Sequence, residues 1–452
     1  MRIVATLLVV MVPALAMAGG IVPAGGALTH GETNQDAFSR PAPSLDGAQL
    51  RAFNLGNRIF NTNWTVAPSS TEAFDGLGPT FNRVSCSGCH LRDGRGRPPI
   101  DGESAMNAML VRWSIPGTDP HGAPRAVPGY GTQLNDRAIP GVAAEAAVSM
   151  TWKETTHRYA DGSEYRLRHP RYAFTGAAYG ALPKRLLVSG RVAPAVIGLG
   201  LLEAIPEAHL VAASDEKDRN GDGISGRVNR VSDPATGKTA VGRYGWKANT
   251  AGLKTQNAAA AQGDIGLSSS LFPAQNCDAG QTACARAVTG GTPELSDDFL
   301  DKLTTYTRTL GVPARRDGDD ATVRRGEALF ATLGCAGCHT PLQKTGPSDI
   351  PQLADQTFAP YTDLLLHDMG AGLADGRPDF LASGREWRTA PLWGIGLVET
   401  VNQHTLYLHD GRARNLAEAI LWHDGEGRRA RDGFRDANKD ERDALLRFLR
   451  SL

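Results

Sequence analysis

The sequence has little excess charge, few aromatic residues, few cysteines and little continuous hydrophobic sequence. Its 452 residues include 48 Lys+Arg and 48 Asp+Glu, so the formal net charge is zero. Such a chain lacks the excess of Lys and Arg that nucleic-acid-binding proteins use to contact phosphates, which argues against nucleic acid as a partner. Aromatic residues make up only 6% of the chain. A chain of this length must then pack aliphatic cores, or pack around something that is not protein.

The hydrophobic run Ile3–Leu15 is too short to span a bilayer. Arg2 precedes it, and the small-residue site Ala16-Met17-Ala18 follows it. This order is typical of a secretory signal peptide, which we place at residues 1–18. We therefore expect a periplasmic protein whose mature form has no membrane span. In an oxidising compartment its cysteines should be paired, ligated or covalently modified.

The six cysteines form three close pairs, and two pairs have the same pattern. Cys86-Ser87-Gly88-Cys89-His90 and Cys335-Ala336-Gly337-Cys338-His339 are both C-x-x-C-H, the attachment motif of c-type haem. Two thiols at this spacing can reach both vinyl groups of one porphyrin, and the adjacent histidine can then bind the iron. A redox dithiol or a zinc site is the alternative, but a dithiol does not need the trailing histidine twice. The sequence therefore predicts two covalently bound c-type haems, with His90 and His339 as iron ligands.

The remaining pair, Cys277 and Cys284, has no adjacent histidine and lies in a polar stretch. We predict a disulfide that closes this short loop.

Several sequence landmarks occur twice, which indicates an internal repeat. Gly56-x-x-Ile59-Phe60 precedes the first haem motif, and Gly326-x-x-Leu329-Phe330 precedes the second. Each unit ends in an amphipathic pattern, at 301–310 and at 443–452. The predicted organisation is a flexible N-terminal segment at 19–40, an enlarged first domain at 41–310, a linker at 311–320 and a second domain at 321–452. Strand signals are weak and predict only short hairpins near 159–167 and 227–231.

Longer motifs around these landmarks support a family resemblance that covers nearly the whole mature chain. They include GPTFNRVSCSGCHLRDGRGRPP, REWRTAPLWGIG and LHDGRARNLAEAILWH. With them the chain resembles the bacterial di-haem oxidoreductases, a peroxidase-like family, and more distantly the di-haem cytochrome c peroxidases and methylamine-utilisation di-haem enzymes. The resemblance implies a mainly α fold of two cytochrome c-like domains in tandem, with long loops and minor β-hairpins. It also implies that one haem meets peroxide while the other relays electrons.

The face of each haem opposite its proximal histidine decides reactivity, since a strong sixth ligand favours electron transfer and an open face admits peroxide. The resemblance places His423 where the relay haem of such peroxidases has its sixth ligand, so we predict His423 as the second ligand of the His339 haem. Met369 is the rival ligand, and His409 is expected to be structural.

In the first unit, the resemblance points to Gln256 and Asp264 as the amide and carboxylate beside the open face. The carboxylate could shuttle a proton between peroxide oxygens. Ile265 replaces a methionine that is usual in the family, which favours an open or differently ligated first haem. The alternatives are that Asp264 is a helix-end or surface residue, and that a different residue ligates the iron. The weaker ligand candidates are His121, Met106 and Met109.

The stretch Asp218-Arg219-Asn220-Gly221-Asp222-Gly223-Ile224 has the D-x-N-x-D-G-I start of a calcium loop. We predict a Ca²⁺ site with ligands from Asp218, Asn220, Asp222 and Ile224. The twelfth position is Asn229 instead of glutamate, so the pattern is not a complete EF-hand. An Asx-rich surface turn is the alternative.

The leading functional prediction is a periplasmic di-haem oxidoreductase of peroxidase type. A small cytochrome or cupredoxin would donate electrons, and hydrogen peroxide or another small oxidant would accept them at a peroxide-reactive iron. The alternative is a non-catalytic di-haem electron carrier or redox sensor, in which both irons have six ligands.

Overall fold

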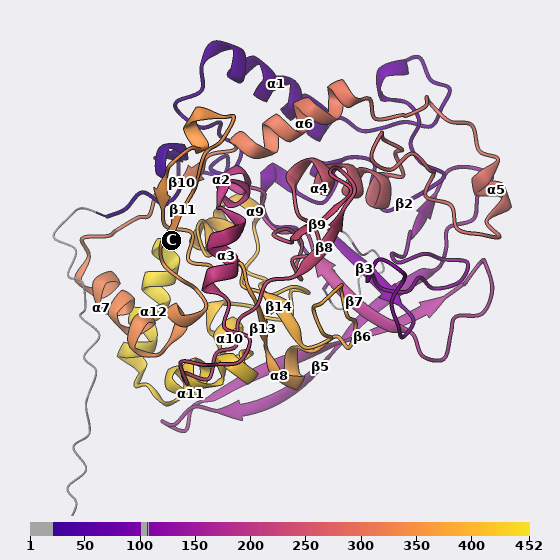
Figure 1. The fold of residues 1–452 in the computed structure, drawn as a ribbon. Coiled ribbons are helices and arrows are strands. Elements are labelled where there is room, and N and C mark those ends of the chain that lie inside the picture. The colour runs from indigo at the N-terminus through magenta and orange to yellow at the C-terminus, as the bar shows by residue number, and fades with distance from the viewer. Residues whose placement is uncertain (1–20, 101–105, 107) are drawn as a thin grey trace, which may run out of the picture.

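A computed structural model describes residues 21–100, 106 and 108–452 of the chain (Figure 1). The signal peptide predicted at residues 1–18 lies outside these residues. Within the described ranges, none of the helices has the length and apolar character needed to cross a membrane.

Two pairs of crossing helices form the helical framework. Helix α1 (Gly47–Asn61) crosses α6 (Asp297–Thr309), and α7 (Ala321–Thr332) crosses α12 (Lys439–Ser451). The remaining helices are α2 (Leu199–Ala204), α3 (Glu207–Ala213), α4 (Leu253–Ala260), α5 (Thr282–Ala285), α8 (Gly370–Leu373), α9 (Val398–Asn402), α10 (Leu416–Leu421) and α11 (Arg428–Asp436).

Glycines at equivalent positions allow the two crossings. A Cβ added to Gly56 would overlap the carbonyl oxygen of Lys302, and one added to Gly326 would overlap that of Ala444. Both glycines come from the repeated landmark that precedes a haem motif. The polar caps Asp46 and Asn438 begin α1 and α12, each with a complete capping box. The sequence repeat therefore corresponds to a repeated helix crossing.

The strands pair into small two-stranded sheets. The parallel pair is β1 (Thr29–His30) with β10 (Val312–Pro313). The antiparallel pairs are β2 (Thr80–Phe81) with β4 (Arg137–Ala138), β3 (Met109–Ser114) with β7 (Leu187–Val192), β5 (Ala147–Arg158) with β6 (Glu164–Thr175), β8 (Arg230–Asp233) with β9 (Lys238–Val241), β11 (Gln343–Lys344) with β12 (Thr357–Phe358), and β13 (Leu366–Asp368) with β14 (Glu386–Arg388).

The prediction of a mainly α protein, two cytochrome c-like domains with minor hairpins, is wrong. Of the residues that the structure describes, 31% are helical and 18% are in strands, so the fold is not dominated by helices. The insertions of the first unit account for the longest strands: β3 pairs with β7 over six residues, and β5 with β6 over twelve. A hairpin does occur at the position predicted near 159–167, where residues 159–163 form the turn and 164–167 begin β6, but its strands are much longer than predicted.

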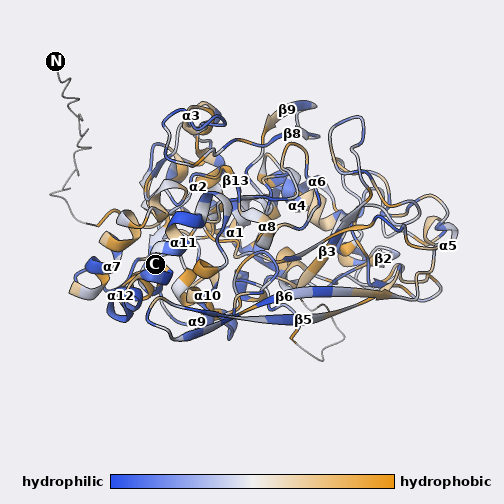
Figure 2. Ribbon diagram, turned by 90° about the horizontal axis from the view of Figure 1, so that it is seen from below, coloured by the Kyte–Doolittle hydropathy of each residue, from blue (hydrophilic) through white to orange (hydrophobic). Residues whose placement is uncertain are grey.

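The β5–β6 hairpin extends from the first unit to the second (Figure 1). Near its turn, Tyr159 packs against Phe434 of α11 with ring centroids 6.4 Å apart, and Asp161 forms an ion pair of 2.6 Å with Arg442 of α12. Polar residues occupy much of its length (Figure 2). The hairpin thus attaches the enlarged first unit to the helices of the second.

Residues 21–40, which we expected to be flexible, contribute to a buried cluster. Leu28 and Phe38 are buried there with Ile197 and Trp393. Strand β1 of this segment pairs with β10, which lies inside the stretch expected to be a linker. This segment and the linker therefore form part of the packed structure.

Candidate functional site

Both C-x-x-C-H motifs line one cavity of about 760 Å³. A volume of this order is typical of pockets that hold a cofactor or ligand. The residues of the two motifs that line it are Cys86, Cys89, His90, Cys335, Cys338 and His339. The cavity therefore brings together two motifs that lie far apart in the sequence.

In the first motif, a 3-10 turn at Cys86–Gly88 positions both thiols and the histidine. The backbone N–H of His90 donates to the carbonyl oxygen of Cys86 at 3.0 Å. His90 Nδ1 lies 2.7 Å from the carbonyl oxygen of Pro194, which can only accept, so Nδ1 carries the proton and Nε2 is left available as a ligand. Burial lowers the pKa of His90 to about 4, which keeps the imidazole neutral.

The second motif repeats this geometry. Its 3-10 turn is Cys335–Gly337, and the N–H of His339 donates to the carbonyl oxygen of Cys335 at 3.0 Å. His339 Nδ1 lies 3.0 Å from the carbonyl oxygen of Tyr361. Burial, and then the neighbouring His423, lower the pKa of His339 to about 4. None of the four motif cysteines forms a disulfide, so all four are available for thioether bonds.

His423 lies across the second site from His339. The centroids of the two imidazole rings are 6.4 Å apart. An imidazole nitrogen binds a transition metal at about 2 Å, and a ring centroid lies about 1.1 Å from its nitrogen, so two imidazoles on opposite sides of one metal have centroids about 6.2 Å apart. His423 Nδ1 donates to the carbonyl oxygen of Ala419 at 2.8 Å, which leaves its Nε2 available. The residues present therefore fit an iron held between two histidines.

Met369, the rival ligand, also lines the cavity. A Cβ added to Gly427 would lie 3.1 Å from the Cβ of His423 and 3.3 Å from the Cε of Met369, so the methionine lies beside His423. His409 packs elsewhere in the cavity wall, stacked on Trp387 with ring centroids 3.6 Å apart. Its contacts are those of a packed aromatic ring.

The wall near the first motif carries Asp264. This residue lies in a single π-helical turn, Ala261–Ile265, that continues α4; such turns are frequent at functional sites. Asp264 Oδ1 accepts a hydrogen bond of 2.9 Å from Gln133 Nε2. Burial raises the pKa of Asp264, while the positive charge of Arg112 opposes that rise. The carboxyl group is thus set in the cavity wall and suited to hold a proton.

Gln256, the other predicted residue, lines the cavity but does not meet Asp264. The two lie eight residues apart on one continuous helical segment, and at 1.5 Å per residue this is about 12 Å along the axis. The amide that contacts Asp264 belongs to Gln133, which the sequence analysis missed. The spacing of residues in the sequence does not point to Gln133, because this residue lies in a distant segment whose backbone is bridged to Arg112 of β3.

Within the described residues, the histidines and methionines that line the cavity are His90, His339, His367, His409, His423 and Met369. The weaker candidates for the first haem are absent from this lining: His121 is exposed, while Met106 and Met109 are buried in a separate core cluster.

The residues of the predicted calcium loop bind their own backbone. The carboxylate of Asp218 accepts from the N–H of Gly223 at 3.1 and 3.2 Å, Asn220 Oδ1 accepts from that of Asp222, and Asp222 Oδ1 accepts from that of Ile224. No group of three or more His, Cys, Asp or Glu side chains in the described ranges could hold a metal. The calcium prediction rests on the sequence pattern alone.

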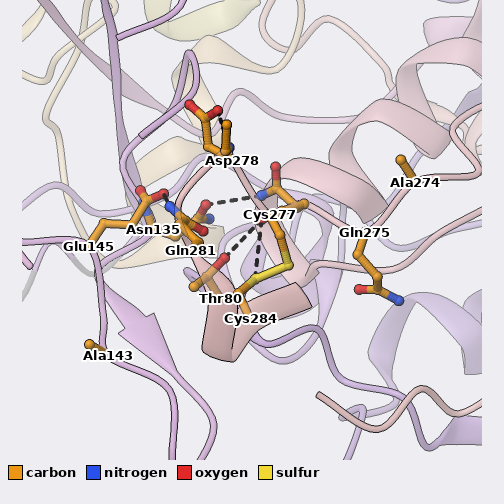
Figure 3. The surroundings of a disulfide bond; sticks show 12 residues. Thr80, Asn135, Ala143, Glu145, Ala274, Gln275, Cys277, Asp278, Gln281 and Cys284 are labelled. Carbon is orange, nitrogen blue, oxygen red and sulfur yellow. Dashed lines mark hydrogen bonds between the residues drawn. A yellow bond between two sulfur atoms is a disulfide. The ribbon is translucent and has the colours of Figure 1, made fainter. Parts of the chain in front are cut away.

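The structure pairs Cys277 with Cys284 in a disulfide, whose Cα atoms are 5.7 Å apart (Figure 3). The preceding residue, Asn276, lines the cavity and donates to Asn135 Oδ1 at 3.0 Å. Asn135 in turn donates to Asn82 Oδ1, which also accepts from Gln133. A chain of amides therefore links the disulfide loop to the residue that contacts Asp264.

Free thiols, neutral histidines and a shared cavity are together suited to a protein that carries two haems. The family described as "Di-haem oxidoreductase, putative peroxidase" matches residues 20–452. The chain belongs to this di-haem oxidoreductase family, so haem is its cofactor and oxidoreduction its class of chemistry. No curated protein and no solved structure matches the chain.

Proposed function

We propose that the protein is an exported c-type di-haem enzyme that reduces peroxide at its first haem and receives electrons through its second. The observation that carries this proposal is the difference between the two sites. His423 lies opposite His339 at 6.4 Å, whereas the cavity wall near His90 offers Asp264 and Gln133.

Thioether bonds from Cys86 and Cys89, and from Cys335 and Cys338, would attach the two haems. His339 and His423 would hold one iron, and a haem with two such ligands would supply electron transfer. His90 would hold the other iron, which would supply the redox chemistry of peroxide reduction.

The chain's own part in the reaction is to handle protons. Asp264 accepts a proton from one peroxide oxygen and returns it to the other, which is general acid–base catalysis. Gln133 donates to Asp264 Oδ1 and fixes the orientation of the carboxyl group. The raised pKa of Asp264 suits this role, because the group can hold the proton between the two transfers.

The proposed electron donor is a small periplasmic cytochrome or cupredoxin. The test measures hydrogen peroxide consumption by the protein with both haems attached and such a reduced donor present. The matched control replaces Cys86 and Cys89 with alanine, which removes the first attachment site and leaves the second. We expect turnover in the parent protein and loss of turnover in the control. No turnover in the parent would favour the electron carrier or sensor, and equal turnover would assign the reaction to the second haem.

A further inference from the structure

Strand β3 presents alternate side chains to a core and to the cavity. Met109, Val111 and Trp113 are buried in one hydrophobic cluster, while Leu110 and Arg112 line the cavity. This alternation is the normal consequence of the two-residue period of a strand. The guanidinium of Arg112 therefore faces the space into which the first haem motif also opens.

No described side chain forms an ion pair with the Arg112 guanidinium. Among the described residues, its guanidinium forms no hydrogen bond, and no carboxylate lies within 4.0 Å of it. Burial lowers its pKa, and the largest opposing influence is the negative charge of Asp264. An enclosed cation without a paired anion is costly, so the cavity favours a negatively charged occupant at this position.

Other polar atoms of the same wall also lack partners. The backbone of Arg112 is bridged to that of Gln133, which places Gln133 beside it. Gln133 Oε1 is buried without a hydrogen bond, and so is Nη2 of Arg191, whose Nη1 pairs with Asp379 at 2.8 Å. The cavity lining thus combines the Arg112 cation, an unused acceptor on Gln133 beside Asp264, and an unused donor on Arg191.

We propose that Arg112 binds the negative end of a small anion on the Asp264 side of the cavity, and that this anion in the reaction is hydroperoxide. The proposal deepens the proposed function and rests on it. Hydrogen peroxide transfers one proton to the Asp264 carboxylate, which gives HOO⁻ and a carboxylic acid. Arg112 then pairs with HOO⁻, and Gln133 Oε1 can accept a hydrogen bond from its remaining O–H.

A carboxylate of the haem itself could supply the same chemistry, since guanidinium groups pair with carboxylates as readily as with other oxyanions. We assign the exogenous anion because Arg112 lines the same cavity as the Asp264 carboxyl group. A permanently charged propionate there would meet that carboxyl group, whereas peroxide can donate a proton to it.

The test titrates fluoride and, separately, neutral imidazole into the holoprotein in its ferric and half-reduced forms, and follows the high-spin haem optically. Arg112→Gln removes the charge, and Arg112→Lys retains it. We expect fluoride affinity to fall about tenfold or more in Arg112→Gln, as for loss of a charged hydrogen bond, and to recover in part in Arg112→Lys. Imidazole affinity and a content of two haems should stay unchanged.

Three outcomes would overturn the assignment: no fluoride binding by the parent protein in either form, equal fluoride affinity in Arg112→Gln, or loss of the first haem from Arg112→Gln. The third would identify Arg112 as a haem propionate anchor. Absence of peroxide turnover together with charge-dependent fluoride binding would reject the peroxidase function and leave the anion site in place.

Discussion

The two C-x-x-C-H motifs have similar local structure, but the cavity walls around them carry different residues. Both have a glycine where two helices cross, a 3-10 turn through the C-x-x-C motif, and a histidine whose Nδ1 donates to a backbone carbonyl. Near the second motif, His423 lies with its ring centroid 6.4 Å from that of His339, whereas near the first motif the cavity wall carries Asp264. The repeated residues are those of the two motifs and their helix crossings, and we propose that the unrepeated residues give the two haems different reactivity.

Replacing His423 with alanine should produce the largest effect, because it makes the second unit resemble the first. We expect the second haem to change from low-spin to high-spin, as seen in its optical and electron paramagnetic resonance spectra. His423→Met is the matched control and should keep six ligands with a higher reduction potential. An unchanged low-spin spectrum in His423→Ala would move the assignment to Met369.

Replacing Asp264 with asparagine should remove the proton-handling group of the first unit. We expect kcat/KM for peroxide to fall about 10²- to 10⁴-fold, the usual contribution of general acid–base catalysis, while haem content stays at two. Gln256→Ala serves as the comparison. Because Gln256 lies about two helical turns from Asp264, we expect this variant to show the smaller fall in kcat/KM. Equal losses in both variants would place the two side chains in one site, against the structure.

The shared scaffold itself can be tested with Gly56→Ala and Gly326→Ala. Each added methyl group would overlap a backbone carbonyl oxygen of the crossing helix, so each should lower the free energy of unfolding by roughly 3 kcal/mol. Gly47→Ala in α1 has room for its Cβ and should be close to neutral. Denaturant unfolding of the three variants measures this, and a large cost at only one crossing would break the equivalence of the units.

A smaller effect should come from a buried polar pair found in the first unit. Tyr306 Oη donates to Asp93 Oδ1 at 2.7 Å, and the equivalent of Tyr306 in the second unit is Phe448. Burial raises the pKa of Asp93 to about 6. The folded state thus holds this proton more tightly than the unfolded state, and the stability that Asp93 contributes is lost as pH rises from about 4 through 6.

Relative to Asp93→Asn, the parent protein should lose up to about 3 kcal/mol of unfolding free energy between pH 4 and pH 7. Tyr306→Phe should make this dependence steeper, because the tyrosine hydrogen bond favours the ionised carboxylate. Denaturant unfolding at several pH values provides the measurement. Parallel pH profiles for the parent and Asp93→Asn would show that Asp93 does not titrate as described.

Local patterns predicted the parts of this protein that depend on residues close in sequence. The amphipathic patterns predicted at 301–310 and 443–452 lie in helices α6 and α12, and both follow from a repeated local pattern. The strands of the insertions were missed because their alternation of buried and exposed residues is weak, as in β5, where most side chains are exposed. Hydrogen bonding to β6 stabilises β5. A sequence pattern considered one segment at a time gives no information on that pairing.

The candidate site was predictable only where one element supplies the residue. Asp264 was predicted from the family resemblance, whereas Gln133, which contacts it, and Arg112, which lines the same cavity, come from distant segments. Their role depends on the pairing of β3 with β7 and on the backbone bridge between Arg112 and Gln133. The spacing of residues in the sequence does not predict those tertiary contacts.

The most direct test of the difference between the two units is the electron paramagnetic resonance and optical spectrum of the half-reduced holoprotein, before and after addition of peroxide. The structure predicts one haem with two histidine ligands in a low-spin state and one high-spin haem whose spectrum changes with peroxide. Two haems that stay low-spin and do not respond to peroxide would contradict it.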